Sequence, residues 1–247
     1  MNTRTRMVAL AAAAACLAGV AGSSTGADAQ PTSSGASSVT AVALANPDPE
    51  HPKVDKTTVQ LDRASGRSWD GDAIAQASAT CAGCTATAAT GQVIVFRSSS
   101  NVQSDNVATA WSQCDGCAST ALSVQVILGS SAPKLVVANR AMALNAACAD
   151  CTARAAAYQF VILGAKRSEL TPRARDLISE VRQQMSTALQ QGAPAPAAAA
   201  RQAAPTTATP GSVRDTLDGL AARLQQQLAA EQGAPSVEVH SDVRTAG

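Results

Sequence analysis

Three C-x-x-C motifs are the residues of this chain whose types and spacing suggest chemistry. They read C-A-G-C at 81–84, C-D-G-C at 114–117 and C-A-D-C at 148–151, and their first cysteines are 33 and then 34 residues apart. Cysteine pairs at this spacing can form a disulfide, supply half of a zinc site or act as a redox dithiol. The candidates for all three chemistries are Cys81, Cys84, Cys114, Cys117, Cys148 and Cys151.

The N-terminal sequence favours the disulfide interpretation. Arg4 and Arg6 precede an apolar run at 7–20, and the A-D-A at 27–29 offers a cleavage site, which together predict a signal peptide. A lipid anchor at Cys16 is the minor alternative. We therefore expect a secreted or cell-envelope protein, in which disulfides are favoured over free thiols. Each motif is predicted to close its own disulfide.

Zinc binding is the second interpretation of the motifs. Two C-x-x-C units from neighbouring repeats would make a Cys₄ site, with the same six cysteines as candidate ligands. Three motifs leave one unit over, and His51 and His240 lie in predicted tails, where they are poor fourth ligands. The sequence therefore predicts no cofactor, with zinc as the alternative.

A redox-active dithiol is the third interpretation. Reactive C-x-x-C pairs usually lie at a helix N-terminus, which lowers the thiol pKa. No such helix is predicted, and three equivalent copies favour a structural role. Trp111 precedes Cys114 as a tryptophan does in thioredoxin-type motifs, but it occurs in one copy only. The chain is predicted to be non-enzymatic, with a thiol–disulfide oxidoreductase as the alternative.

Other classes of function find little support in the sequence. Both histidines are expected in flexible segments, so a Ser-His-Asp or Cys-His site would have no general base. Asp70, Asp72 and Asp105 are interpreted as turn and cap residues rather than an acid/base pair. The formal net charge is +1, which argues against nucleic acid as a partner. After the signal no apolar segment is long enough for a membrane span.

The segments on both sides of each motif alternate with a period of two, which predicts strands. Small residues occupy alternate positions, as at Ala75, Ala77 and Ala79. If the two residues between the cysteines form a turn, small residues on the two arms face each other, and Asp115-Gly116 is a strong two-residue turn. We predict three β-hairpins that form an antiparallel sheet. Three helices interrupted at the motifs, a mainly α repeat, are the alternative.

A glutamine follows each second cysteine after eight residues, at Gln92, Gln125 and Gln159. This row could bind a ligand, but we favour a structural role in which each glutamine hydrogen-bonds across its hairpin. The opposite positions are Ala73, Asn106 and Arg140.

The rest of the chain predicts a simple order of segments. Aromatic residues are scarce, so the core is expected to need covalent staples. Apolar residues at helical spacing, with Thr171 as an N-cap, predict two amphipathic helices that cover the small-residue face of the sheet. The predicted fold class is α+β, with a signal peptide at 1–29, a disordered tether and lead-in at 30–71, a three-repeat domain at 72–166, a helix at 171–191, an Ala/Pro linker at 192–211, a helix at 212–232 and a disordered tail at 233–247.

The repeats resemble those of uncharacterised secreted and envelope-associated bacterial proteins. Those repeats have the pattern N-x-A-x-A-x-N-x-x-C-x-x-C-x-T-x-A-x-A-x-Q-x-V. Copy one here has Ala73, and copy three Arg140, in place of the leading asparagine. The resemblance covers residues 72–190 and implies export and the repeat boundaries, but no activity. The second copy matches best, through Asn106, Ala108, Ala110, Cys114, Cys117, Ala121, Gln125 and Ile127.

The sequence thus predicts an exported, non-enzymatic structural or binding protein. Its partner, a protein or another envelope component, is not identified by any motif. An envelope zinc-binding protein or a thiol–disulfide redox protein is the alternative function.

Overall fold

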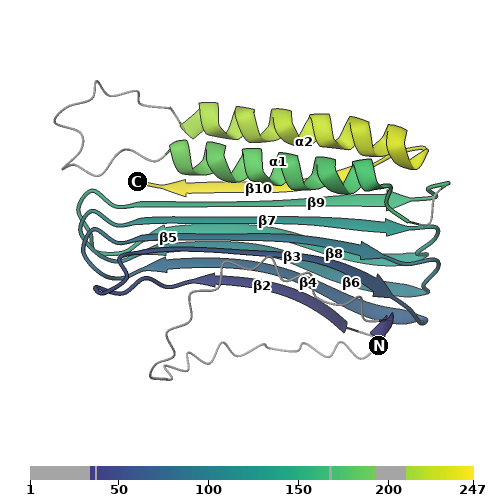
Figure 1. Ribbon diagram of the computed structural model, residues 1–247, viewed down its shortest axis with the longest axis horizontal. Helices are drawn as coiled ribbons and strands as arrows, with labels where there is room; N and C mark the ends of the chain where they lie inside the picture. The colour runs from purple at the N-terminus through teal and green to yellow at the C-terminus, as the bar shows by residue number, and fades with distance from the viewer. Residues whose placement is uncertain (1–33, 37, 167–168, 193–209) are drawn as a thin grey trace, which may run out of the picture.

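The computed structural model describes residues 34–36, 38–166, 169–192 and 210–247 of the chain. The predicted signal peptide and almost all of the predicted Ala/Pro linker lie outside these ranges. The described residues form a β-solenoid with two helices packed on one side (Figure 1).

The solenoid has two sheets, and the chain passes from one to the other in every turn. Sheet A has the strand order β1-β3-β5-β7-β9-β10, and sheet B has the order β2-β4-β6-β8. All neighbours pair in parallel except β9 and β10, which are antiparallel. The strands are β1 (Ser34–Ala36), β2 (Ser38–Ala45), β3 (Lys53–Ala64), β4 (Ser68–Ala79), β5 (Thr85–Val95), β6 (Asn101–Ser112), β7 (Ala118–Gly129), β8 (Lys134–Asn145), β9 (Thr152–Leu163) and β10 (Glu238–Ala246).

The predicted antiparallel sheet of hairpins is therefore wrong. The two arms of each repeat belong to different sheets and face each other across the interior, while each arm pairs with the same arm of the next repeat. A hairpin and a solenoid turn place the same small residues opposite one another, so the alternation alone does not distinguish them. The repeat period does, because strands that recur every 33 residues can stack in register, as Ala77 does on Ala110. The alternative of mainly α repeats is wrong as well.

Two segments predicted to be disordered contain strands. The described part of 30–71 includes β2, β3 and the start of β4, which form a first solenoid turn without cysteines. The tail contains β10, which pairs with β9 from Glu238 opposite Val161 to Ala246 opposite Ala153. Polar residues hid β3 and β10, because each of these strands lies near an end of the solenoid and has an exposed side.

The two predicted helices are confirmed. Helix α1 spans Pro172–Gln191, and the Oγ1 atom of its N-cap Thr171 accepts a hydrogen bond from the Ala174 N–H at 3.0 Å. Helix α2 spans Pro210–Gln232 and is followed by Gly233 in the left-handed conformation. The helices pack on the outer face of sheet A. The prediction that they cover the small-residue face is wrong.

The interior between the sheets is built from small side chains next to the cysteine corners, and at the opposite end it holds a bulkier cluster that includes Trp69, Ile94 and Phe96. Its largest section is a cluster of buried alanines from both sheets, together with Cys84 and Cys117. The sheets approach closely enough for the hydroxyl of Thr90 on β5 to donate to the carbonyl oxygen of Ile74 on β4 at 2.7 Å. The small residues that the sequence shows at alternate positions thus allow side chain to backbone hydrogen bonds between the two sheets.

The outer face of sheet A carries the bulky residues. Leu122, Val124, Tyr158 and Phe160 are all buried there, in one core with the apolar stripes of the two helices. Strands β5, β7 and β9 are consequently buried on both faces. Trp111, by contrast, lies on the outer face of sheet B and is partly exposed.

Candidate functional site

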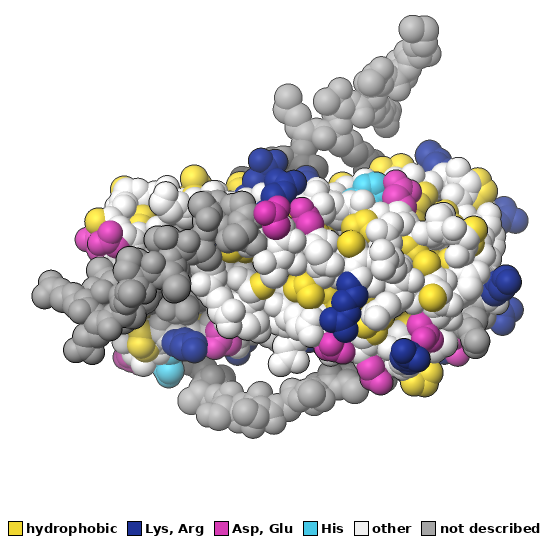
Figure 2. Space-filling model, turned by 90° about the horizontal axis from the view of Figure 1, so that it is seen from above, with side chains coloured by type: hydrophobic (Ala, Val, Ile, Leu, Met, Phe, Trp, Pro, Cys, Tyr) yellow, Lys and Arg dark blue, Asp and Glu magenta, His cyan; other side chains and the backbone are white. Residues whose placement is uncertain are grey.

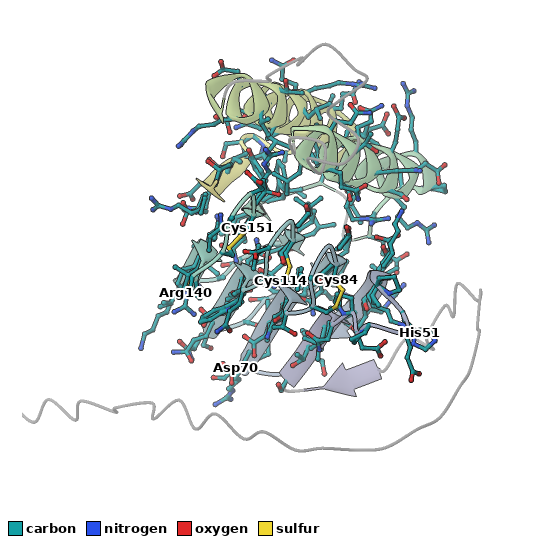
Figure 3. All side chains as sticks on the ribbon, turned by 90° about the vertical axis from the view of Figure 1, so that its left-hand side faces the viewer. His51, Asp70, Cys84, Cys114, Arg140 and Cys151 are labelled. Carbon is teal, nitrogen blue, oxygen red and sulfur yellow. A yellow bond between two sulfur atoms is a disulfide. The ribbon has the colours of Figure 1, made fainter. Side chains whose placement is uncertain are left out.

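The three C-x-x-C motifs are the corners at which the chain leaves sheet B and enters sheet A. Within each corner the two sulfur atoms lie at disulfide distance, and the Cα atoms are 5.4, 5.5 and 6.0 Å apart in chain order. Such Cα separations are in the usual range for disulfides. Figure 3 shows the sulfur atoms in a row along one edge of the solenoid. We call these units the first, second and third corner, at 81–84, 114–117 and 148–151.

The corners stack on one another through backbone hydrogen bonds. The Gly83 N–H donates to the Asp115 carbonyl oxygen at 3.0 Å, and the Gly116 N–H donates to that of Ala149 at 2.9 Å. The sulfur atoms take part in the stack, since Cys117 Sγ lies 3.1 Å from the Cys81 carbonyl oxygen. Each repeat therefore supports the next one at its corner as well as along its strands.

The second cysteine of each corner is more buried than the first. Cys84 and Cys117 are each 1 % exposed and Cys151 is 6 % exposed. Cys81, Cys114 and Cys148 are all of intermediate exposure. The first cysteine of each pair is thus the one that solvent can approach.

The third corner differs from the other two in its backbone. Gly83 and Gly116 have positive φ angles of 68° and 67°, and the equivalent residue of the third corner is Asp150, at 55°. The additional residue that lengthens the last interval to 34 brings Ala147 to a φ of 50° as well. In the first two corners the second cysteine N–H donates to the first cysteine carbonyl oxygen; this bond is not formed in the third corner, all of whose residues the structure describes.

A corner without cysteines precedes the first one, and the sequence prediction missed it. The turn at 46–52 connects β2 to β3, and the Pro52 carbonyl oxygen accepts a hydrogen bond from the Thr85 N–H at 2.8 Å. His51 therefore lies near the cysteine row rather than in a disordered tail, with its Nδ1 3.3 Å from Asp48 Oδ1 (Figure 3). The His51 backbone N–H, followed by the charge and side chain of His51, lowers the pKa of Asp48. The turn-forming N-P-D-P sequence between two alternating segments was the available signal.

The second histidine also lies in a strand. His240 is on β10, in register with Gln159 of β9, and its Nε2 is 3.1 Å from Glu238 Oε1. The prediction that both histidines are flexible is wrong.

The three predicted glutamines come together, but not with the partners that were expected. Gln125 Nε2 donates to Gln92 Oε1 at 2.8 Å, and Gln159 Nε2 donates to Gln125 Oε1 at 2.6 Å. Gln92 Nε2 in turn donates to the buried carboxylate of Asp62 at 3.2 Å. The glutamines thus form an amide ladder along the solenoid instead of bonds across hairpins to the positions of Ala73, Asn106 and Arg140. Because all three are buried, the ladder fixes the register of the turns.

The three aspartates interpreted as turn and cap residues lie on strands instead. Asp70 and Asp72 on β4 and Asp105 on β6 point outward from sheet B, and Asp72 is in register with Asp105. Partial burial raises the pKa of Asp72, and the charges of Asp105 and Asp70 raise it further. Arg140 Nη2 on β8 pairs with Asp105 Oδ2 at 2.9 Å. Figure 3 places Asp70 and Arg140 on this outer face.

Metal binding has no assembled site in the described part of the chain. No group of three or more His, Cys, Asp or Glu side chains among those residues is arranged to hold an ion. Each cysteine is nearest to its partner in the same motif, so the six candidate zinc ligands are brought together in pairs and not in fours.

Comparisons with known proteins add no relative. Protein-family models, curated proteins and solved structures were all searched, and none matches this chain. Among the helices that the structure describes, neither has the length and apolar character needed to cross a membrane.

Proposed function

We propose that this chain is an exported, non-enzymatic scaffold with a binding surface, whose solenoid is fastened by one disulfide in each cysteine corner. The observation that carries the proposal is the position of the cysteines: three pairs occupy equivalent corners of consecutive turns, each at disulfide distance. Disulfides that fasten the repeats are expected at the same position of every repeat, whereas a redox-active site needs only one cysteine pair.

The composition of the interior explains why such fasteners are useful. Alanine buries little apolar area, so the alanine section of the interior next to the corners contributes less per residue than a core of leucine or phenylalanine. A disulfide across a four-residue loop stabilises by about 2 kcal/mol in the loop-entropy model. Three of them are a large fraction of the stability of a typical domain.

The outer face of sheet B supports the binding part of the proposal. Large apolar side chains exposed on the described surface are Val42, Leu44, Val136, Met142 and Leu144 from this face, and Val59 from β3. Those on this face lie on β2 and β8, the two edge strands of sheet B, and exposed apolar side chains on one regular face are typical of an interaction surface. Figure 2, seen from the helix side of the molecule, shows basic and acidic groups interspersed among uncharged ones, so that side offers no extended basic patch for a polyanion.

The proposal is tested by removing the staples one at a time. The paired variants C81S/C84S, C114S/C117S and C148S/C151S should each lower the free energy of unfolding by about 2 kcal/mol, measured by urea denaturation at pH 7. A variant with two outward serines, S68A/S78A, serves as the matched control and should unfold like the parent chain. Unchanged stability in all three cysteine variants would contradict a fastening role.

A further inference from the structure

The third corner is the place where the stack of corners ends. The first corner is covered by the turn at 46–52 on one side and by the second corner on the other. The second corner lies between the first and the third, and the Ala149 N–H donates to Asp115 Oδ1 at 2.9 Å. On its other side, among the residues that the structure describes, the end of β10 approaches in place of a further corner, with Gly247 near the Cys151 carbonyl oxygen. The third corner therefore has a stacked corner on one side only.

The backbone of the third corner is also the least favourable of the three. A positive φ angle costs a residue with a Cβ atom free energy that glycine does not lose, although aspartate tolerates it better than alanine does. Ala147 and Asp150 both adopt such angles. In the first two corners the position equivalent to Asp150 is a glycine, Gly83 or Gly116. Opening the third corner lets these two residues relax.

From these two independent features we propose that Cys148–Cys151 is a thiol–disulfide exchange site that accepts a thiol from solution at Cys148, while the first two corners remain closed. The inference rests on the proposed oxidised state of the three pairs and goes beyond a purely structural role for them. It assigns a covalent modification site to one staple and leaves the other two as fasteners.

The exchange step conserves electrons and needs no external oxidant. A thiolate attacks Sγ of Cys148, the more exposed cysteine of the pair, and forms a new S–S bond to it. The bond between Cys148 Sγ and Cys151 Sγ breaks, and Cys151 leaves as a thiolate that takes a proton from water. The reverse attack by Cys151 expels the bound thiol and restores the corner.

Charges around the corner indicate which thiols it accepts. Asp115 and Asp150 are both exposed beside it. The arginines of β9 and β10, the two strands of sheet A at this corner, are occupied, since Arg154 Nη1 donates to the Leu189 carbonyl oxygen at the end of α1 and Arg244 Nε pairs with Asp242 at 2.9 Å. A cationic or neutral thiol should therefore react faster than an anionic one.

The experiment measures the opening rate of each corner in the folded chain. The oxidised protein is treated with cysteamine, free thiols are trapped with N-ethylmaleimide over time, and tryptic peptides are quantified by mass spectrometry. Trypsin places each corner on its own peptide, at 68–97, 98–134 and 141–154. We expect peptide 141–154 to acquire cysteamine and maleimide at least about tenfold faster than the other two, because one-sided stacking and backbone strain act together.

Matched variants test the origin of that difference. The double variant A147G/D150G should slow exchange at the third corner by about fivefold, since glycine removes the strain. The converse variant Gly83→Asp should accelerate the first corner by a similar factor. At Gly83 no atom lies within 4 Å of an added Cβ, so that substitution changes backbone strain without a clash. At equal thiolate concentration, cysteamine should react faster than 2-mercaptoethanesulfonate, and salt should reduce the difference.

Two outcomes would overturn the inference. Equal rates at all three corners, or first opening at the first or second corner, would show that the third corner is not special. If the A147G/D150G variant exchanged as fast as the parent chain, backbone strain would not be the cause of faster exchange at the third corner. A separate result, an intact mass that shows six free motif thiols before any treatment, would instead contradict the proposed function.

Discussion

The outer faces of the two sheets differ sharply, although the same repeats build both. On sheet A, Phe160 and its neighbours are fully buried beneath α1 and α2, and Tyr158 Oη donates to Asp218 Oδ1 of α2 at 2.8 Å. On sheet B, Met142 is 52 % exposed and no described helix lies over the face. The bulky layer thus stabilises the fold from one side, which leaves the other face available for contact with a partner.

The interior between the two sheets is a third environment, and it holds the two sheets together. Its alanines bring the sheets close, and its polar residues pair along the stack, as Gln125 does with Gln92. Because apolar burial is small in the alanine section, that section depends on close fit, on the glutamine ladder and on the cysteine corners. The following substitutions compare the three environments.

The largest effect is expected from truncation under the helices. Phe160→Ala should lower the free energy of unfolding by about 3–5 kcal/mol, because it removes a fully buried aromatic side chain and leaves a cavity. Met142→Ala on the outer face of sheet B is the matched control and should change it by less than about 0.5 kcal/mol. Chemical denaturation of both variants measures the difference, and similar losses would show that sheet B is covered in solution.

A smaller loss is expected from adding volume to the interior. Ala110→Leu on β6 should destabilise by about 1–3 kcal/mol, because it forces the two sheets apart. Thr109→Leu, one residue away on the same strand but pointing outward, should have little effect. If Ala110→Leu were tolerated as well as Thr109→Leu, the close approach of the two sheets would be wrong.

The smallest effect concerns pH on the outer face of sheet B. The folded-state pKa of Asp72 is raised, so its ionisation disfavours folding, and this penalty grows as the pH rises through the folded-state pKa. Asp72→Asn should therefore raise the Tm at pH 7, by less than about 3 °C because the site is half-exposed. The gain should vanish below about pH 4, where the aspartate is protonated in both states. Thermal scans at both pH values measure it, and a gain that persisted at pH 3 would not come from this carboxylate.

Part of the fold could be predicted from the sequence because local patterns determine it. The helices followed from the Thr171 cap and from apolar residues at helical spacing, and the strands followed from small residues at alternate positions. The partner of each strand could not be obtained in this way, because pairing between repeats is a tertiary property. A period-two pattern is compatible with a hairpin and with a solenoid turn alike.

In the candidate site, too, the sequence identified local features but not the contacts between repeats. The sequence identified the cysteine pairs by their spacing, and the structure places each pair at disulfide distance. It identified the glutamine row but gave it the wrong partners, because the bonds run along the stack from Gln159 to Gln125. The corner at 46–52 and the strand containing His240 were missed, because they lack the cysteines that mark the repeats.

The most direct test of the disulfide-fastened scaffold is mass spectrometry of the purified chain, without prior reduction. The account predicts an intact mass about six hydrogens lower than that of the reduced chain, with one closed disulfide in each of the peptides 68–97, 98–134 and 141–154. Free thiols in the motifs, or disulfides that join two different peptides, would contradict it.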